Sequence, residues 1–210
     1  MEWIWILVSA VAAYLIGSIS TAILVGKLLS GDDIRSHGSG NAGATNALRT
    51  YGKKAALFVL LGDVLKAIVA VGVARLLWSL NGMTEDGWRL MLYAATIGAV
   101  LGHNFPVYFK FRGGKGVLVS TVAIFFADWR IGLCVLVISL LIMILSRYVS
   151  LGSVLGAVAY VLLVCVFHWS DWLRLVHTVI LSGLLIYMHR GNIQRLLSGT
   201  ENKLGQKKQG

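Results

Sequence analysis

The sequence predicts an all-α integral membrane protein with seven transmembrane helices, an N-terminus outside and a C-terminus in the cytoplasm. Its 210 residues are 57% hydrophobic and only 13% charged, whereas soluble domains carry about 25% charged residues. The mean hydropathy is +0.78. One proline and 24 glycines suit packed membrane helices better than a loop-rich soluble fold.

Seven apolar segments approach the length that a bilayer requires, which is about 20 residues, or about 17 where packing and tilt allow. The first segment carries no charge, and the fourth is the shortest. Only Asp128-Trp129-Arg130 separates the fourth from the fifth. The expected spans are 3–26, 55–80, 88–102, 117–127, 131–146, 151–167 and 172–188.

The distribution of basic residues sets the expected orientation. Fourteen of the 19 lysines and arginines lie in one set of connections, and the opposite set holds four. The positive-inside rule therefore places the N-terminus outside. The same rule accounts for the net charge of +10, so nucleic-acid binding is not expected. We expect one membrane domain over residues 1–197, followed by a polar, mobile cytoplasmic tail over 198–210.

The most informative segment is residues 37–49, here called the first glycine loop: His-Gly-Ser-Gly-Asn-Ala-Gly-Ala-Thr-Asn-Ala-Leu-Arg. Its glycines let the backbone approach a ligand closely, and its short polar side chains can bind an anion, above all a phosphate. A flexible turn between helices is the alternative. The match to the fingerprint G-x-G-x-x-G carries little weight because no strand precedes it. The expected ligand contacts are Ser39, Gly40, Asn41, Gly43, Thr45, Asn46 and Arg49.

The second glycine loop, residues 113–116, lies on the same predicted face. It is not a Walker loop, because no Ser or Thr follows Lys115 at the required place. Backbone amides around one point charge would still suit a phosphate, with Gly114, Lys115 and Gly116 as contacts. A basic loop that touches lipid headgroups is the alternative. Two phosphate-type loops at the edge of a bilayer favour a phosphorylated substrate with an apolar partner.

Ionisable residues inside the spans are expected to support these loops. Asp63 and Lys66 are three residues apart on one helix and can face each other. Charges in a span are costly and face a polar interior. The pair could orient a charged residue of the site, or be purely structural. His103, ahead of the second glycine loop, is expected to order that loop.

Polar residues also mark the cytoplasmic ends of the last two spans. His189 could act as a general base near neutral pH, or merely flank a helix end. Asn192 follows it and could orient polar groups of a substrate. Ser150 and Ser153 could donate to a phosphate, or cap a helix.

These motifs resemble the acyl-phosphate-dependent glycerol-3-phosphate acyltransferases, the PlsY family of bacterial inner-membrane enzymes. The resemblance implies a seven-helix protein of the bacterial cytoplasmic membrane with its active site on the cytoplasmic face. It also implies transfer of a fatty acyl group from acyl phosphate to the 1-hydroxyl of glycerol 3-phosphate, giving lysophosphatidic acid and phosphate. The segments that carry it are 17–18, 38–46, 63–66, 102–106, 111–116, 147–153 and 189–195.

The loops and the resemblance together assign catalysis to Ser39, Lys115 and His189. The proton of the attacking hydroxyl could pass to His189 or to the substrate's own phosphate. The expected partners are glycerol 3-phosphate, fatty acyl phosphate and membrane lipid, and a monomer is expected. The sequence contains no cluster with metal-ligand spacing, so neither a metal nor another cofactor is expected. A transporter for an organic phosphate is the competing class, although its site would lie near the midplane rather than at one face.

Overall fold

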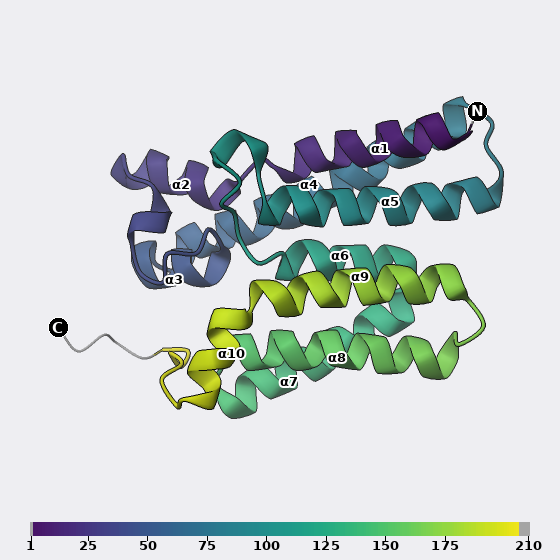
Figure 1. Cartoon of the computed structure of the whole chain (residues 1–210). Helices are drawn as coiled ribbons and strands as arrows, with labels where there is room; N and C mark the ends of the chain where they lie inside the picture. The colour runs from purple at the N-terminus through teal and green to yellow at the C-terminus, as the bar shows by residue number, and fades with distance from the viewer. Residues whose placement is uncertain (1, 206–210) are drawn as a thin grey trace. The chain divides into compact units, whose positions relative to one another are not determined.

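The computed structural model describes residues 2–205. These residues form helices joined by loops, without a strand, which confirms the all-α prediction. The chain divides into two compact units between Ala127 and Asp128. The elements are α1 Glu2–Gly17, α2 Thr21–Ser30, η1 Ile34–Ser36, α3 Ala44–Tyr51, α4 Lys53–Leu80, α5 Glu85–Asn104, η2 Val107–Phe109, α6 Val117–Ala127, α7 Trp129–Ser146, α8 Val149–Phe167, α9 Trp172–Met188 and α10 Arg190–Leu197 (Figure 1).

The first unit is built on the close packing of α1 against α5, with α4 alongside both (Figure 1). Glycines of α5 let the two backbones touch. A Cβ at Gly98 would overlap the Ala10 carbonyl, and one at Gly102 would overlap the Tyr14 carbonyl. Such small-residue contacts are typical of helix packing in membranes, where van der Waals contact replaces the hydrophobic drive.

The first apolar segment, expected as one span over 3–26, contains a break at residues 18–20. α1 ends at Gly17, and α2 starts at Thr21 after the buried Ser18 and Ser20. The Ser18 hydroxyl donates to the Tyr14 carbonyl at 2.8 Å, which helps to satisfy the helix end. The break turns the Ile19 carbonyl away from a helical partner and makes it available to a side chain of α4.

The second unit is a bundle of α7, α8 and α9 that ends in the short α10 (Figure 1). Asp128 caps α7 by accepting from the amides of Arg130 and Ile131. Its carboxylate also accepts from Arg174 Nη1 at 2.9 Å and lies 3.1 Å from His168 Nε2. This cluster ties together the start of α7, the end of α8 and the start of α9.

Within residues 2–205, fewer than the seven expected segments have the length and hydropathy of a membrane span. Five of them qualify: Glu2–Ser30, Lys53–Leu80, Glu85–Phe109, Trp129–Ser146 and Val149–Phe167. The pair α9 and α10, bent by 59°, would make a sixth. α6 has 11 residues, which is short of the roughly 17 that a span needs. A count of seven therefore depends on α6 and stays a prediction.

Replacing Gly98 by Ala should destabilise the first unit, because the added methyl group would meet the Ala10 carbonyl. Overpacking of this kind costs about 1–3 kcal/mol, and thermal unfolding in detergent would show it as a lower midpoint. Gly72→Ala is the matched control, since a Cβ on Gly72 of α4 meets nothing within 4 Å. A midpoint for Gly98→Ala equal to that of the control would contradict the close α1–α5 approach.

Candidate functional site

The first glycine loop is shaped by one buried amide, that of Asn46 on α3. Its Nδ2 donates to the carbonyls of Ile34 and His37 at 3.2 and 3.0 Å, and its Oδ1 accepts from the Ser39 amide at 2.8 Å. Gly38 has φ +60, and a Cβ there would overlap Asn46 Oδ1. Only glycine fits both the left-handed backbone and the close approach.

The fold of this loop leaves Ser39 exposed at its tip. The chain then enters α3 through Gly43, which offers no side-chain cap. Backbone N–H groups in the first turn of a helix are partly positive and favour an anion. A glycine-rich loop that leads into an uncapped helix is therefore suited to hold a phosphate.

An apolar core anchors the loop from beneath. Ala42 and Ala47 belong to the loop segment itself and are fully buried, so the loop backbone is packed rather than free in solvent. The core draws its other members from α2, η1 and α4: Ala22, Ile23, Ile34 and Val59.

The second glycine loop folds back on the end of α5. The amide of Gly113 donates to the Asn104 carbonyl, and that of Gly114 to the His103 carbonyl, both at 3.1 Å. Between helix and loop, Lys110 and Phe111 have φ values of 58 and 56. Left-handed backbone is uncommon for side chains of this size and has to be stabilised by the surroundings.

The two glycine loops touch at Gly114. A Cβ on this buried residue would lie 2.5 Å from the Ala42 carbonyl oxygen and would overlap the His103 ring. Any larger residue would push the second loop away from the first. Because Lys115 follows directly, this contact fixes where its charge stands relative to the first loop.

A buried polar cluster lies behind the second loop and joins Asp63, Lys66 and His103. Lys66 Nζ is 2.9 Å from each of three acceptors: Asp63 Oδ1, His103 Nδ1 and the Ile19 carbonyl at the α1–α2 break. An ammonium only donates, so His103 Nδ1 accepts and its Nε2 carries the proton. That Nε2 faces Gly114. The structure thus connects the three predicted supporting residues to the second glycine loop.

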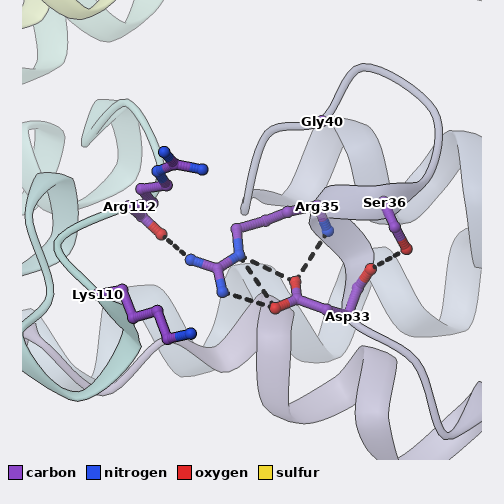
Figure 2. Close-up of a pocket in the computed structure, with 7 residues that line it drawn as sticks. Asp33, Arg35, Ser36, Gly40, Lys110 and Arg112 are labelled. Atoms are coloured by element: carbon purple, nitrogen blue, oxygen red, sulfur yellow. Dashed lines mark hydrogen bonds and ion pairs between the residues drawn. The ribbon is translucent and has the colours of Figure 1, made fainter.

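A pocket of about 750 Å³ opens beside the two loops (Figure 2). Asp33 and Arg35 form an ion pair in its wall, with Arg35 Nη2 2.6 Å from Asp33 Oδ2. The hydrogen bonds from the Arg35 side chain hold the pKa of Asp33 below its usual range, against the opposing effect of burial. The residues that line the pocket are Asp33, Arg35, Ser36, Gly40, Lys110, Arg112 and Gly113.

In the second unit, polar residues gather around Glu201. Its Oε1 accepts from Asn192 Nδ2 at 2.7 Å and from Ser150 Oγ at 3.0 Å, and its Oε2 accepts from Arg195 Nε at 2.8 Å. Burial alone would raise the pKa of Glu201, but these hydrogen bonds outweigh burial and hold the pKa below its usual value. Glu201 thereby ties α10 to the start of α8.

His189 lies at the bend between α9 and α10 and is 2% exposed. Its Nδ1 is 2.8 Å from the Leu185 carbonyl. A carbonyl only accepts, so Nδ1 carries the proton and Nε2 is the basic nitrogen of the neutral ring. The fixed ring orientation suits proton transfer at Nε2.

Several predicted substrate contacts bond to protein groups in the structure, and their contact with a substrate stays a prediction. Asn46 organises the first glycine loop, and Ser150 and Asn192 hold Glu201. Ser153 donates to the Val149 carbonyl in its own helix at 2.9 Å. Short polar side chains near a helix end often bond to nearby backbone instead of a ligand.

The other predicted contacts differ in their exposure, and their contact with a ligand stays a prediction. In the first unit, Gly40 is exposed and lines the pocket, and Arg49 is exposed on α3. Asn41, Gly43, Thr45 and Lys115 are partly exposed, whereas Gly116 is buried at the start of α6.

Sequence reasoning missed Glu201 and the Asp33–Arg35 pair. Glu201 was expected in a mobile tail, yet it is 9% exposed and bonded to three residues. The remaining tail, 206–210, lies outside the described residues. Neither Glu201 nor the Asp33–Arg35 pair lies in a segment with apolar periodicity. The sequence therefore contained no signal from which their hydrogen-bond partners could be predicted.

A family model described as glycerol-3-phosphate acyltransferase matches residues 7–199. The chain belongs to this family. A glycerol-3-phosphate acyltransferase of Thermoanaerobacter sp. (strain X514) is 45% identical over 199 residues, which cover 95% of this chain and 96% of the relative. The resemblance expected from the sequence motifs is thus confirmed.

Solved structures support the same family assignment. A crystal structure of PlsY, an integral membrane glycerol 3-phosphate acyltransferase in its glycerol 3-phosphate form, has a TM-score of 0.83 at 34% identity, over 95% of this chain and 96% of that one. Its lysophosphatidic acid form has a TM-score of 0.79 at 33% identity, over 95% of each chain. The family fold is therefore that of an integral membrane protein.

For this member of the glycerol-3-phosphate acyltransferase family, Lys66→Met should be strongly destabilising. The change leaves the buried Asp63 carboxylate without its counter-charge, which costs about 3–5 kcal/mol, and thermal unfolding in detergent would measure it. Lys53→Met, at the exposed start of the same helix, is the control. The double variant Asp63→Asn/Lys66→Met should lose less than the sum of the single changes; additive losses would contradict the coupling.

Glu201→Gln should destabilise this acyltransferase-family chain at neutral pH and leave it nearly unaffected in acid. The folded-state pKa of Glu201 lies below its usual value of 4.5. The ionised group therefore stabilises the fold above pH 4.5, and this stabilisation is lost as the pH falls through the lower folded pKa. Thermal unfolding from pH 7 to pH 3 should show the two proteins converge. Glu85→Gln, exposed at the start of α5, should show no comparable pH-dependent gap.

Proposed function

We propose that this chain transfers a fatty acyl group from acyl phosphate to the 1-hydroxyl of glycerol 3-phosphate, giving lysophosphatidic acid and inorganic phosphate. This would be the first acylation of phospholipid synthesis. The contact of the two glycine loops at Gly114 carries the proposal, because it brings two backbone-lined, phosphate-type loops together in one unit. Family membership supports the acceptor, and the chemistry of the loops supports a phosphorylated donor.

The proposed reaction is a direct acyl transfer. The glycerol oxygen attacks the acyl carbonyl carbon, the bond from that carbon to the phosphate oxygen breaks, and phosphate leaves with the bonding pair. Acyl phosphate is a mixed anhydride, so its carbonyl is already electrophilic. The enzyme then needs mainly positioning and charge stabilisation, with neither a covalent acyl-enzyme nor a metal or cofactor. Unchanged turnover in EDTA is the expected result for a metal-independent enzyme.

Ser39 and Lys115 are the proposed catalytic residues of the first unit. The exposed Ser39 hydroxyl and the Lys115 ammonium would bind phosphate oxygens, with Arg49 adding charge. Gly40, Asn41, Gly43, Thr45, Gly114 and Gly116 would supply backbone or short side-chain contacts. Asp63, Lys66 and His103 would act from behind the second glycine loop by holding Gly114 in place.

His189 is the proposed general base of the second unit. Its Nδ1–H is directed to the Leu185 carbonyl, which leaves Nε2 as the nitrogen that can accept the proton of the glycerol hydroxyl. The substrate's own phosphate is the alternative acceptor. A pH–rate profile of wild type and His189→Asn separates the two: an acidic limb that persists unchanged in the variant would favour the phosphate.

We further propose a single domain over residues 1–197 that crosses the bacterial cytoplasmic membrane seven times as a monomer. The N-terminus would lie outside, and both glycine loops and the tail would face the cytoplasm. Single cysteines introduced at Lys27 and Asn81 in a Cys134→Ala/Cys165→Ala background would test this with an impermeant thiol reagent on intact cells. The proposed topology predicts that the reagent labels Asn81→Cys and not Lys27→Cys. The opposite pattern would show that the topology is reversed.

A turnover assay on purified protein tests the proposed donor. The sample would receive glycerol 3-phosphate with either palmitoyl phosphate or palmitoyl-CoA, and lysophosphatidic acid would be measured. Product from palmitoyl phosphate alone supports the proposal. Product only from palmitoyl-CoA would overturn the donor, and no product from either in a folded sample would favour an organic-phosphate transporter.

Lys115→Ala should lower kcat rather than only weaken substrate binding, because the proposed ammonium acts on charge that develops in the transition state. Removal of one such donor costs about 10²–10³ in rate. Steady-state kinetics with varied glycerol 3-phosphate would measure kcat and KM separately. Lys54→Ala, which removes an exposed charge from α4, is the control. An unchanged kcat in Lys115→Ala would eliminate this role.

A further inference from the structure

The Arg35 side chain uses its donors on protein groups that have no role in the proposed chemistry. Nε donates to both carboxylate oxygens of Asp33, at 3.0 and 3.1 Å, and Nη2 donates to Oδ2 at 2.6 Å. Nη1 donates to the carbonyls of Phe109 and Arg112, at 2.8 and 2.6 Å. Figure 2 shows Arg35 between the Asp33 carboxylate and the Arg112 carbonyl. We name this arrangement the Asp33–Arg35 clasp.

The clasp joins two segments that are more than 70 residues apart in the chain. Arg35 lies in η1, directly ahead of the first glycine loop. Its carbonyl partners, Phe109 and Arg112, lie directly ahead of the second glycine loop. A single side chain thus spans from one loop to the other, in the wall of the pocket.

The two carbonyls that Arg35 holds bracket the strained part of the chain. Lys110 and Phe111, the residues between them, are both in the left-handed region. Residues of this size leave that region unless their surroundings fix them. Three backbone bonds close the turn internally: the amides of Phe109 and Phe111 donate to the Pro106 carbonyl at 3.1 and 3.0 Å, and the Arg112 amide donates to the Phe109 carbonyl at 3.4 Å. Arg35 supplies the external restraint on both sides of the turn.

We infer that Arg35 is a positioning residue for the proposed acyl transfer, and that Asp33 orients it. By fixing the turn over residues 109–112, the clasp determines where Gly114 meets Ala42 and hence where Lys115 stands relative to Ser39. This inference rests on the proposed function for its kinetic effect. The restraint of the turn itself is independent of that function.

The geometry requires arginine at this position rather than any cation. A guanidinium presents five N–H donors in a planar fork, so one face can bind a carboxylate while another nitrogen binds carbonyls. A lysine ammonium is a single point that cannot span both partners. Arg35→Lys therefore keeps the charge and removes the bridge, which makes it the sharpest substitution.

The kinetic test compares Arg35→Lys with Arg130→Lys. Arg130 is exposed on α7, outside both glycine loops, so its replacement is a control for the arginine-to-lysine change itself. A misplacement of about 1 Å can cost about 10²-fold in rate, so we expect Arg35→Lys to lose kcat by about this factor with a much smaller change in KM. Arg130→Lys should stay within about twofold of wild type, as exposed substitutions usually do.

Hydrogen–deuterium exchange on the same full-length proteins provides a readout that does not depend on activity. In Arg35→Lys, amides over residues 107–114 should exchange faster, while those of α4 should stay as in wild type. The swapped pair Asp33→Arg/Arg35→Asp should also exchange faster, because it restores an ion pair without placing the guanidinium at position 35. Normal exchange in α4 would show that each variant is folded.

A wild-type kcat in Arg35→Lys would overturn the inference. A loss of kcat with unchanged exchange over 107–114 would also overturn it, because Arg35 would then act on the substrate directly. If the wild-type chain transferred no acyl group, the proposed function would fail, and the exchange difference would still decide whether the clasp restrains the turn.

Discussion

The packing of the first unit depends on the hydrogen bonds of the buried Lys66 ammonium. A buried charge needs its full set of hydrogen-bond partners, and Lys66 has three from three different segments: Asp63 one turn away, His103 on α5 and the Ile19 carbonyl. The Ile19 carbonyl is available only because the chain breaks between α1 and α2. An interruption that would weaken an isolated span therefore satisfies the charge that connects three helices.

A chain of contacts connects Lys66 to both glycine loops. His103, held at Nδ1 by Lys66, presents its Nε2 to Gly114, and Gly114 rests against the Ala42 carbonyl of the first loop. Asn46 holds the first loop from within, and Glu201 plays a comparable part in the second unit. These contacts hold both loops from the protein side, which is the preorganisation that charge stabilisation requires.

Much of this could be predicted from the sequence. Apolar length identified the long helices, and small-residue composition identified both glycine loops, because each depends on local properties of the chain; the short helices α3 and α10 were not predicted. The break after Gly17 was missed, since Ser18 and Ser20 do not interrupt the apolar pattern of 3–26. The protein partners of Asn46 and Ser150 were also missed, because a ligand contact and a hydrogen bond within the protein use the same amide and hydroxyl groups. Only the tertiary structure reveals which partner each group has.

The orientation of the His189 ring brings it into contact with the C-terminal end of α9, the helix that precedes it. The ring sits at the C-terminal end of α9, where peptide dipoles leave partial negative charge on the last carbonyls, and its Nδ1–H points at one of them, Leu185. An imidazolium formed by proton uptake at Nε2 would face that negative end and strengthen the same hydrogen bond. The backbone of α9 would thereby supply the counter-charge for a protonated histidine, a task that many enzymes leave to a carboxylate side chain.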